Sequence, residues 1–462
     1  MKRYLMRIPC LILVLCLLFS SCAPYRQSFS SGEGVWRMGF GSEEIPLPED
    51  SDEPLYIAGY NAGWEITGVL DLQRANALWI DAGGEGILLI GIDCVGLGKD
   101  VVDRIRGELS DFCRKAECVS VNVYATHTHA GADTLGLWGP AAIDGKNQAF
   151  MTNLVNAAVV AAKEAYADRS EGTLHYGNTV TKELLHDSRA PVQYDPVLHQ
   201  LRFIPGDESK NGIRLLSYAA HAESLRGDNT MLSRDFPGAL ADKLQEACGD
   251  DVMYLPGAIG GLIMTRELVE PFDAVANMRY TAERIAEYVL AIRDEAEIEP
   301  RLSFSSVSME IPLDNTLFFY YKFLGILGNE TSRGKSDTGY VIHSELGVLS
   351  LGSVTLALIP GEIFPELVSG KDLGEGDPEA LEQIAARYGA ERLLIVGLCN
   401  DELGYIVPPS DFLLHGELPY IESAKDETGE SHYEETNSAG RETAACIARA
   451  FEAALKKQGS LK

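Results

Sequence analysis

The sequence predicts a mixed α/β fold of the α+β type, in which layered β-sheets are flanked by helices within a single domain. Strand-like and helix-like segments alternate up to about residue 300, and strand-like segments then cluster together. No linker-like composition interrupts residues 53 to 456. With 462 residues, of which 46% are hydrophobic, the chain can bury one large core or two moderate ones.

The first 22 residues are typical of a bacterial export signal. Three basic residues precede the apolar run from Leu11 to Phe19, which is too short to span a bilayer comfortably. The run ends in two serines and Cys22, a pattern that resembles the lipobox of bacterial lipoproteins. We therefore expect an exported protein, anchored to a membrane of the cell envelope by a lipid on Cys22. The alternative is ordinary signal cleavage that leaves Cys22 unmodified.

The next segments are expected to be a tether and the start of the folded body, which would span residues 53–462. Residues 23–52 are rich in Ser, Gly, Glu and Pro with little periodicity, which favours a flexible tether. A hairpin follows from Ala77, where ALWIDA and GILLIGIDCVGL are joined at two glycines. The apolar face of a helix comes next, marked by Val101, Ile105, Leu109 and Phe112.

The remaining elements follow from apolar periodicity. The strand SVNVYATHTH precedes a helix from about Phe150 to Tyr166, and the strand GIRLLSYAAH leads to a helix that Asp235 would cap and Pro237 would open. A further helix carries apolar residues spaced 4, 3, 4 and 3 apart, namely Met278, Ala282, Ile285, Val289 and Ile292. After residue 300 the predicted strands are LSFSSVSMEIPL, GVLSLG, VTLALIPGE and LLIVGLCN, and the closing helix carries Ile447, Phe451 and Leu455.

Charge and cysteine usage argue against a nucleic-acid partner and against a zinc–thiolate site. The chain has 39 basic and 68 acidic residues, and its net charge of -29 repels nucleic acid. The six cysteines after Cys22 contain no CxxC pair, which argues against a zinc–thiolate site. Cys113 and Cys118 are close enough in sequence to form a disulfide, and solitary buried thiols are the alternative for these residues.

The segment YATHTHAGADT carries the sharpest chemical signal. Residues two apart in an extended segment point to the same face, so His127 and His129 project together from a strand end. Two adjacent imidazoles repel each other when protonated, and a metal ion relieves this repulsion by binding at least one of them as the neutral base. The alternative is a pair of hydrogen-bonded histidines on a surface strand.

Three further residues each follow an apolar strand, where a loop begins. His221 ends GIRLLSYAAH, Glu362 lies in LIPGEIFPEL, and Tyr405 lies in GLCNDELGYIVP. Strand ends hold a side chain rigidly, as a metal ligand requires. Taken alone, each residue has a simpler interpretation: a core histidine, a helix-capping or solvated carboxylate, and a packed tyrosine.

Together, these motifs resemble the neutral ceramidase family. ATHTHAG, the AxH...SxDFPG block, the PGE turn and GLxNDxxGYxxP occur in the family's order over roughly residues 55 to 440, as in its catalytic N-terminal domain. The resemblance implies a zinc ion held by His127, His221, Glu362 and Tyr405, with His129 beside the water that zinc activates. It also implies that Arg189, in DSRAPVQYDP, faces the substrate carbonyl.

The activity implied by this resemblance is zinc-dependent hydrolysis of a linear amide, such as a ceramide-like N-acyl amide. Zinc lowers the pKa of its water to near neutrality and polarises the amide carbonyl, although these ligand types also suit manganese or iron. His129 would accept the water proton and return one to the departing amine, and Arg189 would stabilise the oxyanion. The expected partners are this small-molecule or lipid amide and the membrane that holds the anchor.

Two departures from the family pattern separate this chain from its longer members. Residues 254–264 read YLPGAIGGLIM, where the family carries a serine in a Gly-Asp-Val-Ser-Pro-Asn block. A serine acyl-enzyme route at this position is therefore excluded, and the glycines are expected to shape a turn or a pocket floor. Because the sequence stops at Lys462, we also expect no immunoglobulin-like C-terminal domain of the kind that the longer family members have.

Two other functions are compatible with the sequence. The first is a surface lipoprotein that keeps the ceramidase-like fold without activity. The second is an amidohydrolase-type metal barrel that acts on another amide or an ester. In such a barrel, the HxH motif would lie near the first strand and helices would alternate with strands to the end of the chain.

Overall fold

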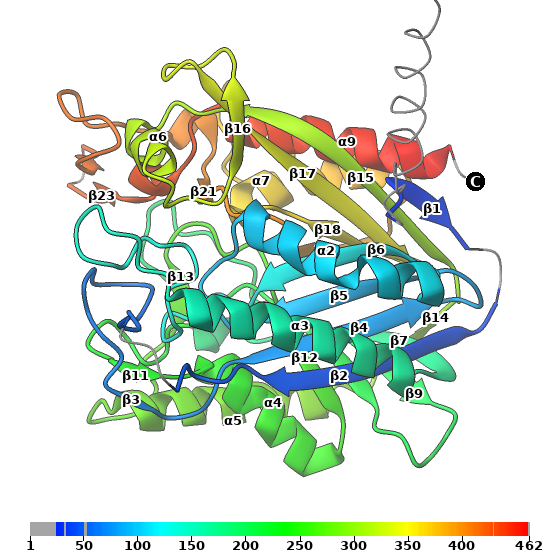
Figure 1. Cartoon of the computed structure of the whole chain (residues 1–462). Coiled ribbons are helices and arrows are strands. Elements are labelled where there is room, and N and C mark those ends of the chain that lie inside the picture. The colour runs from blue at the N-terminus through cyan, green and yellow to red at the C-terminus, as the bar shows by residue number, and fades with distance from the viewer. Residues whose placement is uncertain (1–24, 32–33, 50–52, 428, 461–462) are drawn as a thin grey trace, which may run out of the picture.

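The computed structural model describes residues 25–31, 34–49, 53–427 and 429–460, which form four layers: helices, two β-sheets and helices again (Figure 1). One hydrophobic cluster fills the space between the sheets and takes Leu89 from one sheet and Leu356 from the other. Neighbouring residues on the same strands, such as Leu88 and Ala357, point outward to the helical layers. This alternation is what strands buried on both faces require.

The larger sheet has nine strands, and its longest path runs in the order β12-β10-β9-β7-β2-β4-β5-β6, with β14 paired to β7. Its strands are β2 (Trp36–Glu44), β4 (Arg74–Asp81), β5 (Gly86–Ile92), β6 (Cys118–Ala125), β7 (Ser170–Val180), β9 (Val197–Pro205), β10 (Ile213–Tyr218), β12 (Asp251–Pro256) and β14 (Ala296–Ile298). The predicted hairpin is confirmed, because β4 pairs antiparallel with β5 from Asp81 opposite Gly86.

The smaller sheet has six strands in the order β1-β15-β17-β18-β20, with β16 paired to β17. They are β1 (Ser28–Ser30), β15 (Leu302–Pro312), β16 (Glu330–Arg333), β17 (Tyr340–Leu351), β18 (Val354–Leu358) and β20 (Arg392–Val396). Four two-stranded pairs lie outside these sheets: β3 (Gly68–Val69) with β11 (Met231–Leu232), β8 (Leu185–Asp187) with β13 (Ile263–Thr265), β19 (Glu362–Ile363) with β21 (Tyr405–Ile406), and β22 (Ala424–Lys425) with β23 (Ser431–His432).

The helices cover the outer faces of the two sheets. Helices α2 (Lys99–Ala116), α3 (Gln148–Asp168), α4 (Asp235–Cys248) and α5 (Ala274–Ala291) pack on the nine-stranded sheet, and α7 (Pro365–Ser369), α8 (Leu381–Arg387) and α9 (Thr443–Gly459) pack on the six-stranded sheet. Helix α6 (Thr316–Phe323) and three short 3-10 helices, Lys182–Leu184, Pro409–Asp411 and Glu434–Asn437, lie in connections. In the described ranges, no helix is long and apolar enough to cross a membrane.

This architecture confirms the predicted mixed α/β class and contradicts the barrel alternative. The described strands form two large open sheets, and the late strands follow one another with few intervening helices. An amidohydrolase-type barrel would instead close eight parallel strands into a ring. The cysteines 94, 113, 118, 248, 399 and 446 are all free thiols in this structure, so the possible Cys113–Cys118 disulfide is absent from the described residues.

The predicted tether over residues 23–52 is wrong where the chain forms β1 and β2. Strand β2 pairs with both β4 and β7, and Trp36 and Met38 are buried between the sheets. The glycines that suggested flexibility allow close packing instead, because a Cβ atom on Gly39 would lie 2.3 Å from the Ala165 carbonyl oxygen of α3. The predicted signal and Cys22 lie outside the described residues.

Candidate metal centre

The candidate ligands lie on segments that leave the ends of four strands, two from each large sheet. His127 and His129 follow β6, His221 follows β10, Glu362 follows β18, and Tyr405 follows β20. Backbone pairing then fixes these segments to one another. Thr128 bridges Ala222 in parallel, and Glu362 is opposite Tyr405 in the parallel β19–β21 pair. The sheet edges therefore bring together residues that are far apart in the sequence.

Three imidazoles and one carboxylate converge at this point. The Nε2 atoms of His127 and His129 are 3.1 Å apart. The Glu362 Oε2 atom lies 2.9 Å from His221 Nε2 and 3.4 Å from His127 Nε2. The three histidines each offer a nitrogen within 4.8 Å of the others, which is close enough to share one metal ion. His127 also adopts φ 67°, a left-handed conformation that is unfavourable for this residue type and is found preferentially at functional sites.

Backbone carbonyl groups orient two of the imidazoles for metal binding. His127 Nδ1 lies 2.6 Å from the Val95 carbonyl oxygen, and His221 Nδ1 lies 2.7 Å from the Ile263 carbonyl oxygen. When each Nδ1–H group donates to its carbonyl, each Nε2 atom keeps a free lone pair for a metal. Together with the Glu362 carboxylate, these atoms form a donor set that fits zinc, manganese or iron.

His129 differs from the other two histidines in its surroundings. Its Nδ1 atom has no hydrogen-bond partner in the described chain and lies 3.5 Å from the Glu223 carboxylate. The Tyr60 hydroxyl donates to that carboxylate over 2.5 Å, and the Tyr60 ring meets the His129 ring edge-on at 5.3 Å. Asp235 holds the same loop by accepting hydrogen bonds from the backbone N–H groups of Ser224 and Leu225.

In the metal-free cluster, burial and neighbouring charges shift the pKa values of His129, His221 and Glu362 in different ways. Burial and the neighbouring imidazoles hold the pKa of His129 well below its usual value, so this ring is neutral at neutral pH. Burial opposes charge on His221 as well, but its hydrogen bond to Glu362 raises the pKa of His221 to about 9. Burial would also raise the pKa of Glu362, but His127 and His221 outweigh burial and lower it, which keeps the carboxylate ionised.

A largely apolar pocket of about 260 Å³ adjoins these residues. His127, His129, Glu362 and Tyr405 line it together with the polar side chains of Glu402 and Asn329. Its other walls are mostly aromatic and aliphatic: Tyr60, Leu135, Leu137, Trp138, Leu317, Phe318, Tyr321, Leu327 and Tyr433. An apolar cavity with a few converging polar groups is the usual form of a small-molecule site.

Comparison with known proteins relates this arrangement to solved structures. No protein-family model and no curated protein sequence matches the chain. The neutral ceramidase structure from Pseudomonas aeruginosa matches with a TM-score of 0.70 and 16% sequence identity, over 93% of this chain and 75% of that one. The chain has the neutral ceramidase fold. A structure described as ceramidase complexed with C2 matches with a TM-score of 0.67 and 16% identity, over 92% of this chain and 75% of that one.

In this ceramidase-like chain, the segment 254–264 contributes to the candidate metal centre without a serine. Gly260 lies against β19, where a Cβ atom would be 2.5 Å from the backbone of Ile363 and Phe364. The segment then reaches Ile263, whose carbonyl group orients His221. Gly260 and Gly261 lie in a turn, as predicted, and Gly260 allows close approach to the strand that carries Glu362.

The structure does not bring Arg189 to the pocket wall. Its guanidinium is buried and lies 2.6 Å from Glu434, 2.7 Å from Asp411 and 3.1 Å from Glu435. These contacts neutralise the charge that an oxyanion would need, so no contact supports the oxyanion role of Arg189, which stays a prediction. Glu434 and Glu435 directly follow Tyr433, which lines the pocket, so Arg189 instead fixes this part of the pocket wall.

Three residues of the site were not predicted from the sequence: Tyr60, Glu223 and Glu402. Glu223 could have been noticed because it lies two positions after His221, whereas nothing near Tyr60 marks it as part of a site. Burial and the charge of Glu362 raise the pKa of Glu402 well above its usual value. Glu402 Oε2 has no hydrogen-bond partner within the described ranges, so a protonated Glu402 can offer a hydrogen bond into the pocket.

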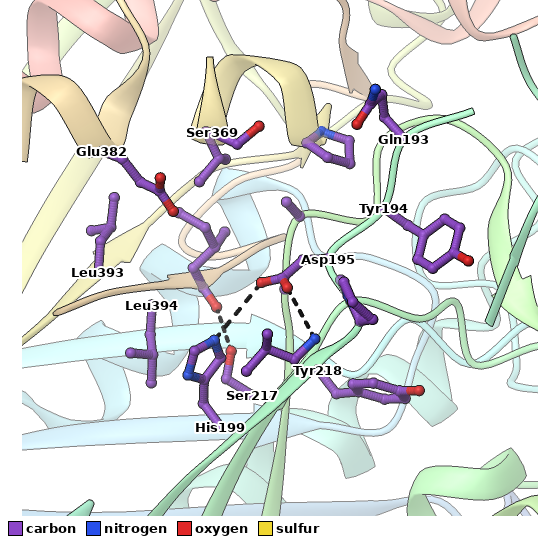
Figure 2. Close-up of a pocket in the computed structure, with 18 of the residues that line it drawn as sticks. Gln193, Tyr194, Asp195, His199, Ser217, Tyr218, Ser369, Glu382, Leu393 and Leu394 are labelled. Carbon is purple, nitrogen blue, oxygen red and sulfur yellow. Dashed lines mark hydrogen bonds and ion pairs between the residues drawn. The ribbon is translucent and has the colours of Figure 1, made fainter. Parts of the chain in front are cut away.

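A second cavity of about 300 Å³ contains serine, histidine and aspartate but lacks a nucleophile arrangement (Figure 2). The Ser217 hydroxyl donates to the Ile395 carbonyl oxygen over 3.2 Å, instead of to His199. His199 Nδ1 is 2.8 Å from the Tyr176 hydroxyl, and its Nε2 atom is 3.8 Å from Asp195. The histidine that would activate the serine is therefore paired elsewhere, and the metal centre is the better candidate site.

This arrangement predicts that Ser217→Ala leaves hydrolytic activity within about twofold of the unaltered protein, because Ser217 makes a structural hydrogen bond worth about 1 kcal/mol. Steady-state kinetics on a soluble N-acyl amide, together with a thermal melt, would check it. A loss of activity of a hundredfold or more in a folded Ser217→Ala variant would move the catalytic site to this second cavity.

Proposed function

We propose that this protein is a zinc-dependent hydrolase of linear N-acyl amides of the ceramide-like type. The observation that carries the proposal is the convergence of His127 Nε2, His221 Nε2 and Glu362 Oε2 beside an apolar pocket. The two similar structures are ceramidases, which supports an amide of a lipid as the substrate class.

His127, His221 and Glu362 would hold the zinc ion, and Tyr405 would complete the set. Tyr405 is buried beside Glu362, and both burial and the charge of Glu362 raise the pKa of its hydroxyl well above the usual value. A bound divalent cation would reverse this effect by favouring the phenolate. When bound, zinc would supply Lewis-acid polarisation of the amide carbonyl and acidification of the attacking water.

His129 would move the proton during hydrolysis. Its ring is neutral in the metal-free cluster, so Nε2 can accept a proton from the attacking water and later return it to the departing amine. Glu223 lies at the opposite nitrogen of the ring, where a carboxylate stabilises the protonated imidazole and fixes its orientation. Tyr60 holds Glu223 in place through its hydroxyl.

The walls of the pocket would select the substrate. Leu135, Trp138, Phe318 and their neighbours offer apolar surface that would bind an acyl chain. These side chains carry no charged group that would bind a polar chain. Glu402, kept protonated by burial, would donate a hydrogen bond to a polar atom near the scissile amide. A serine acyl-enzyme formed within residues 254–264 plays no part in this route, because that segment contains no serine.

We further propose that the protein acts at the bacterial cell envelope as a lipoprotein anchored through Cys22. The proposal rests on the signal-like sequence of residues 1–22. Strand β1 begins at Ser28, only a few residues after Cys22, so the connection to the anchor can span about 20 Å at most. The hydrolase body would therefore stay close to the membrane surface.

Hydrolysis of N-acyl amides of graded chain length tests the proposed activity directly. The proposal predicts metal-dependent release of the amine, which chelation abolishes and added zinc restores. A protein that binds stoichiometric metal but releases no amine from any of these substrates would favour the inactive surface lipoprotein instead.

Glu223→Gln is predicted to lower kcat about 10- to 100-fold with little change in KM, because the amide keeps the shape but removes the charge that stabilises protonated His129. Kinetics on a soluble N-acyl amide would measure both constants. Glu267→Gln is the matched control, since Glu267 is an exposed carboxylate whose ion pair with Arg226 is long, at 3.9 Å. Equal kinetics for the Glu223→Gln variant and the unaltered protein would remove Glu223 from the mechanism.

A further inference from the structure

Helix α6 carries apolar side chains both into the pocket and out to solvent. Leu317, Phe318 and Tyr321 line the pocket beside the metal centre. On the same helix and its end, Tyr320 is 51% exposed, Phe323 is 79% exposed and Leu324 is 43% exposed. Figure 1 shows α6 at the edge of the molecule, away from the layered core. The outward face therefore continues the apolar surface of the pocket to the protein exterior.

Other exposed apolar side chains border the same opening. Ile143 is 59% exposed and lies in a loop whose neighbouring Lys146 donates to the Ile326 carbonyl group just after α6. Trp64 is 38% exposed and follows Gly63, whose N–H group donates to the carbonyl oxygen of the pocket residue Trp138 over 2.8 Å. We call the five residues Tyr320, Phe323, Leu324, Ile143 and Trp64 the rim patch.

The charge of α6 itself contrasts with that of the rest of the chain. Residues 316–327, TLFFYYKFLGIL, contain one lysine and no carboxylate, although the chain as a whole has 68 acidic residues and a net charge of -29. Phenylalanine, tyrosine, tryptophan and a flanking lysine are the side chains that favour the interface of a lipid bilayer. A bilayer of zwitterionic lipid accepts such a surface without the repulsion that an anionic one would impose on the acidic body.

The size of the patch argues against a second copy of the chain as its occupant. Exposed portions of the five side chains amount to roughly 400–500 Å², given about 150–250 Å² for each whole aromatic side chain. A stable protein interface needs about 800 Å² from each partner. A bilayer has no such threshold, because each inserted side chain contributes separately to partitioning.

We propose that the rim patch docks on the surface of a zwitterionic lipid bilayer, with α6 inserted at the level of the headgroups. Docking in this way places the mouth of the pocket against the membrane, so a lipid amide can pass from the bilayer along the inner face of α6 to the metal centre. The identity of that lipid as a substrate rests on the proposed function, whereas docking itself does not.

Co-sedimentation with phosphatidylcholine vesicles tests the docking. The protein is used from residue 23 onward, which retains every described strand and helix and removes the predicted anchor at Cys22. The double variant Tyr320→Ser/Phe323→Ser is expected to lower the vesicle partition coefficient at least tenfold, since each aromatic contributes about tenfold when it inserts. Phe272→Ser/Tyr280→Ser is the matched control, because these aromatics are 41% and 42% exposed on the other side of the fold near α5.

The same comparison in a His127→Ala background separates docking from hydrolysis. Docking is supported if vesicle binding persists in this background and is lost only when Tyr320 and Phe323 are replaced. This result would support docking even if no amide is cleaved. Equal partitioning of both double variants and the unaltered protein would overturn the proposal. A monomer–dimer equilibrium that the α6 variant abolishes, without vesicle binding, would overturn it in favour of a second copy.

A single substitution covers the case in which the double variant is poorly folded. Phe323→Trp adds an indole at the most exposed position of α6. The fluorescence of this added indole is expected to be quenched by phosphatidylcholine brominated on its acyl chains, relative to a Phe272→Trp control. Equal quenching of the Phe323→Trp and Phe272→Trp variants in the presence of saturating vesicles would contradict insertion.

Discussion

Replacing His129 by alanine is expected to lower kcat for a soluble N-acyl amide by about 10²- to 10⁴-fold while the protein keeps its metal. The reason lies in the different surroundings of the three imidazoles. His127 and His221 each turn Nε2 toward the Glu362 carboxylate, at 3.4 and 2.9 Å, whereas the carboxylate near His129 is that of Glu223, 3.5 Å from Nδ1. Loss of His129 therefore removes the proton acceptor without removing a proposed ligand.

Steady-state kinetics and elemental analysis on the same preparation would check this prediction. His175→Ala is the control, because His175 lies on β7, with its Nε2 atom beside the Thr173 hydroxyl, outside the pocket lining. The three histidines are mutually close enough for all of them to bind one ion. Loss of metal together with activity in the His129→Ala variant would therefore make His129 a ligand and leave proton transfer to another group.

Replacing Trp36 by alanine is expected to lower the free energy of unfolding by about 3–5 kcal/mol. Trp36 is 2% exposed between the two sheets, and its indole N–H group donates to the Ile298 carbonyl oxygen over 2.8 Å. The substitution leaves a cavity in the central core and an unpaired carbonyl group in it. This result would establish that residues before position 53 belong to the folded body.

Urea denaturation would measure the effect, with Val35→Ala as the matched control. Val35 is adjacent in sequence and 47% exposed, so its truncation should change the free energy of unfolding by no more than about 0.5 kcal/mol. Similar, small effects of the two substitutions would mean that the segment is the flexible tether that its composition suggests.

Elements with a strong apolar period could be predicted from the sequence. The β4–β5 hairpin and helices α2, α3 and α9 bury continuous apolar runs or faces, so local pattern and tertiary burial agree. Strand β2 was missed because its two glycines resemble a linker, although they serve close packing against α3. Helix α6 was missed because TLFFYYKF is apolar on all sides and shows no 3.6-residue period.

The candidate ligands could be predicted in part because ligand side chains have a chemical signature. His127, His129, His221, Glu362 and Tyr405 all follow apolar strands, and the structure brings them to one pocket or its edge. The groups that orient them have no such signature, because any residue can supply the backbone carbonyls now found at Val95 and Ile263. The likeness of fold to ceramidases at 16% identity likewise does not fix the role of each residue.

The surroundings of Arg189 likewise could not be predicted from the sequence. Arginine in a loop after a strand is a reasonable oxyanion partner, and nothing local in DSRAPVQYDP argues against that role. The acidic groups that bind its guanidinium are 222 to 246 residues away in the sequence. Only the tertiary structure reveals that the charge of Arg189 is already neutralised.

Metal content is the most direct test of the central claim, which is that His127, His221 and Glu362 form a metal centre. The measurement is elemental analysis of the purified protein from residue 23 onward, alongside His127→Ala and Glu362→Ala. We predict about one zinc ion per chain in the unaltered protein and loss of the ion in both variants, with each variant still folded. Absence of bound metal in the unaltered protein, even after reconstitution with zinc, manganese or iron, would contradict the account.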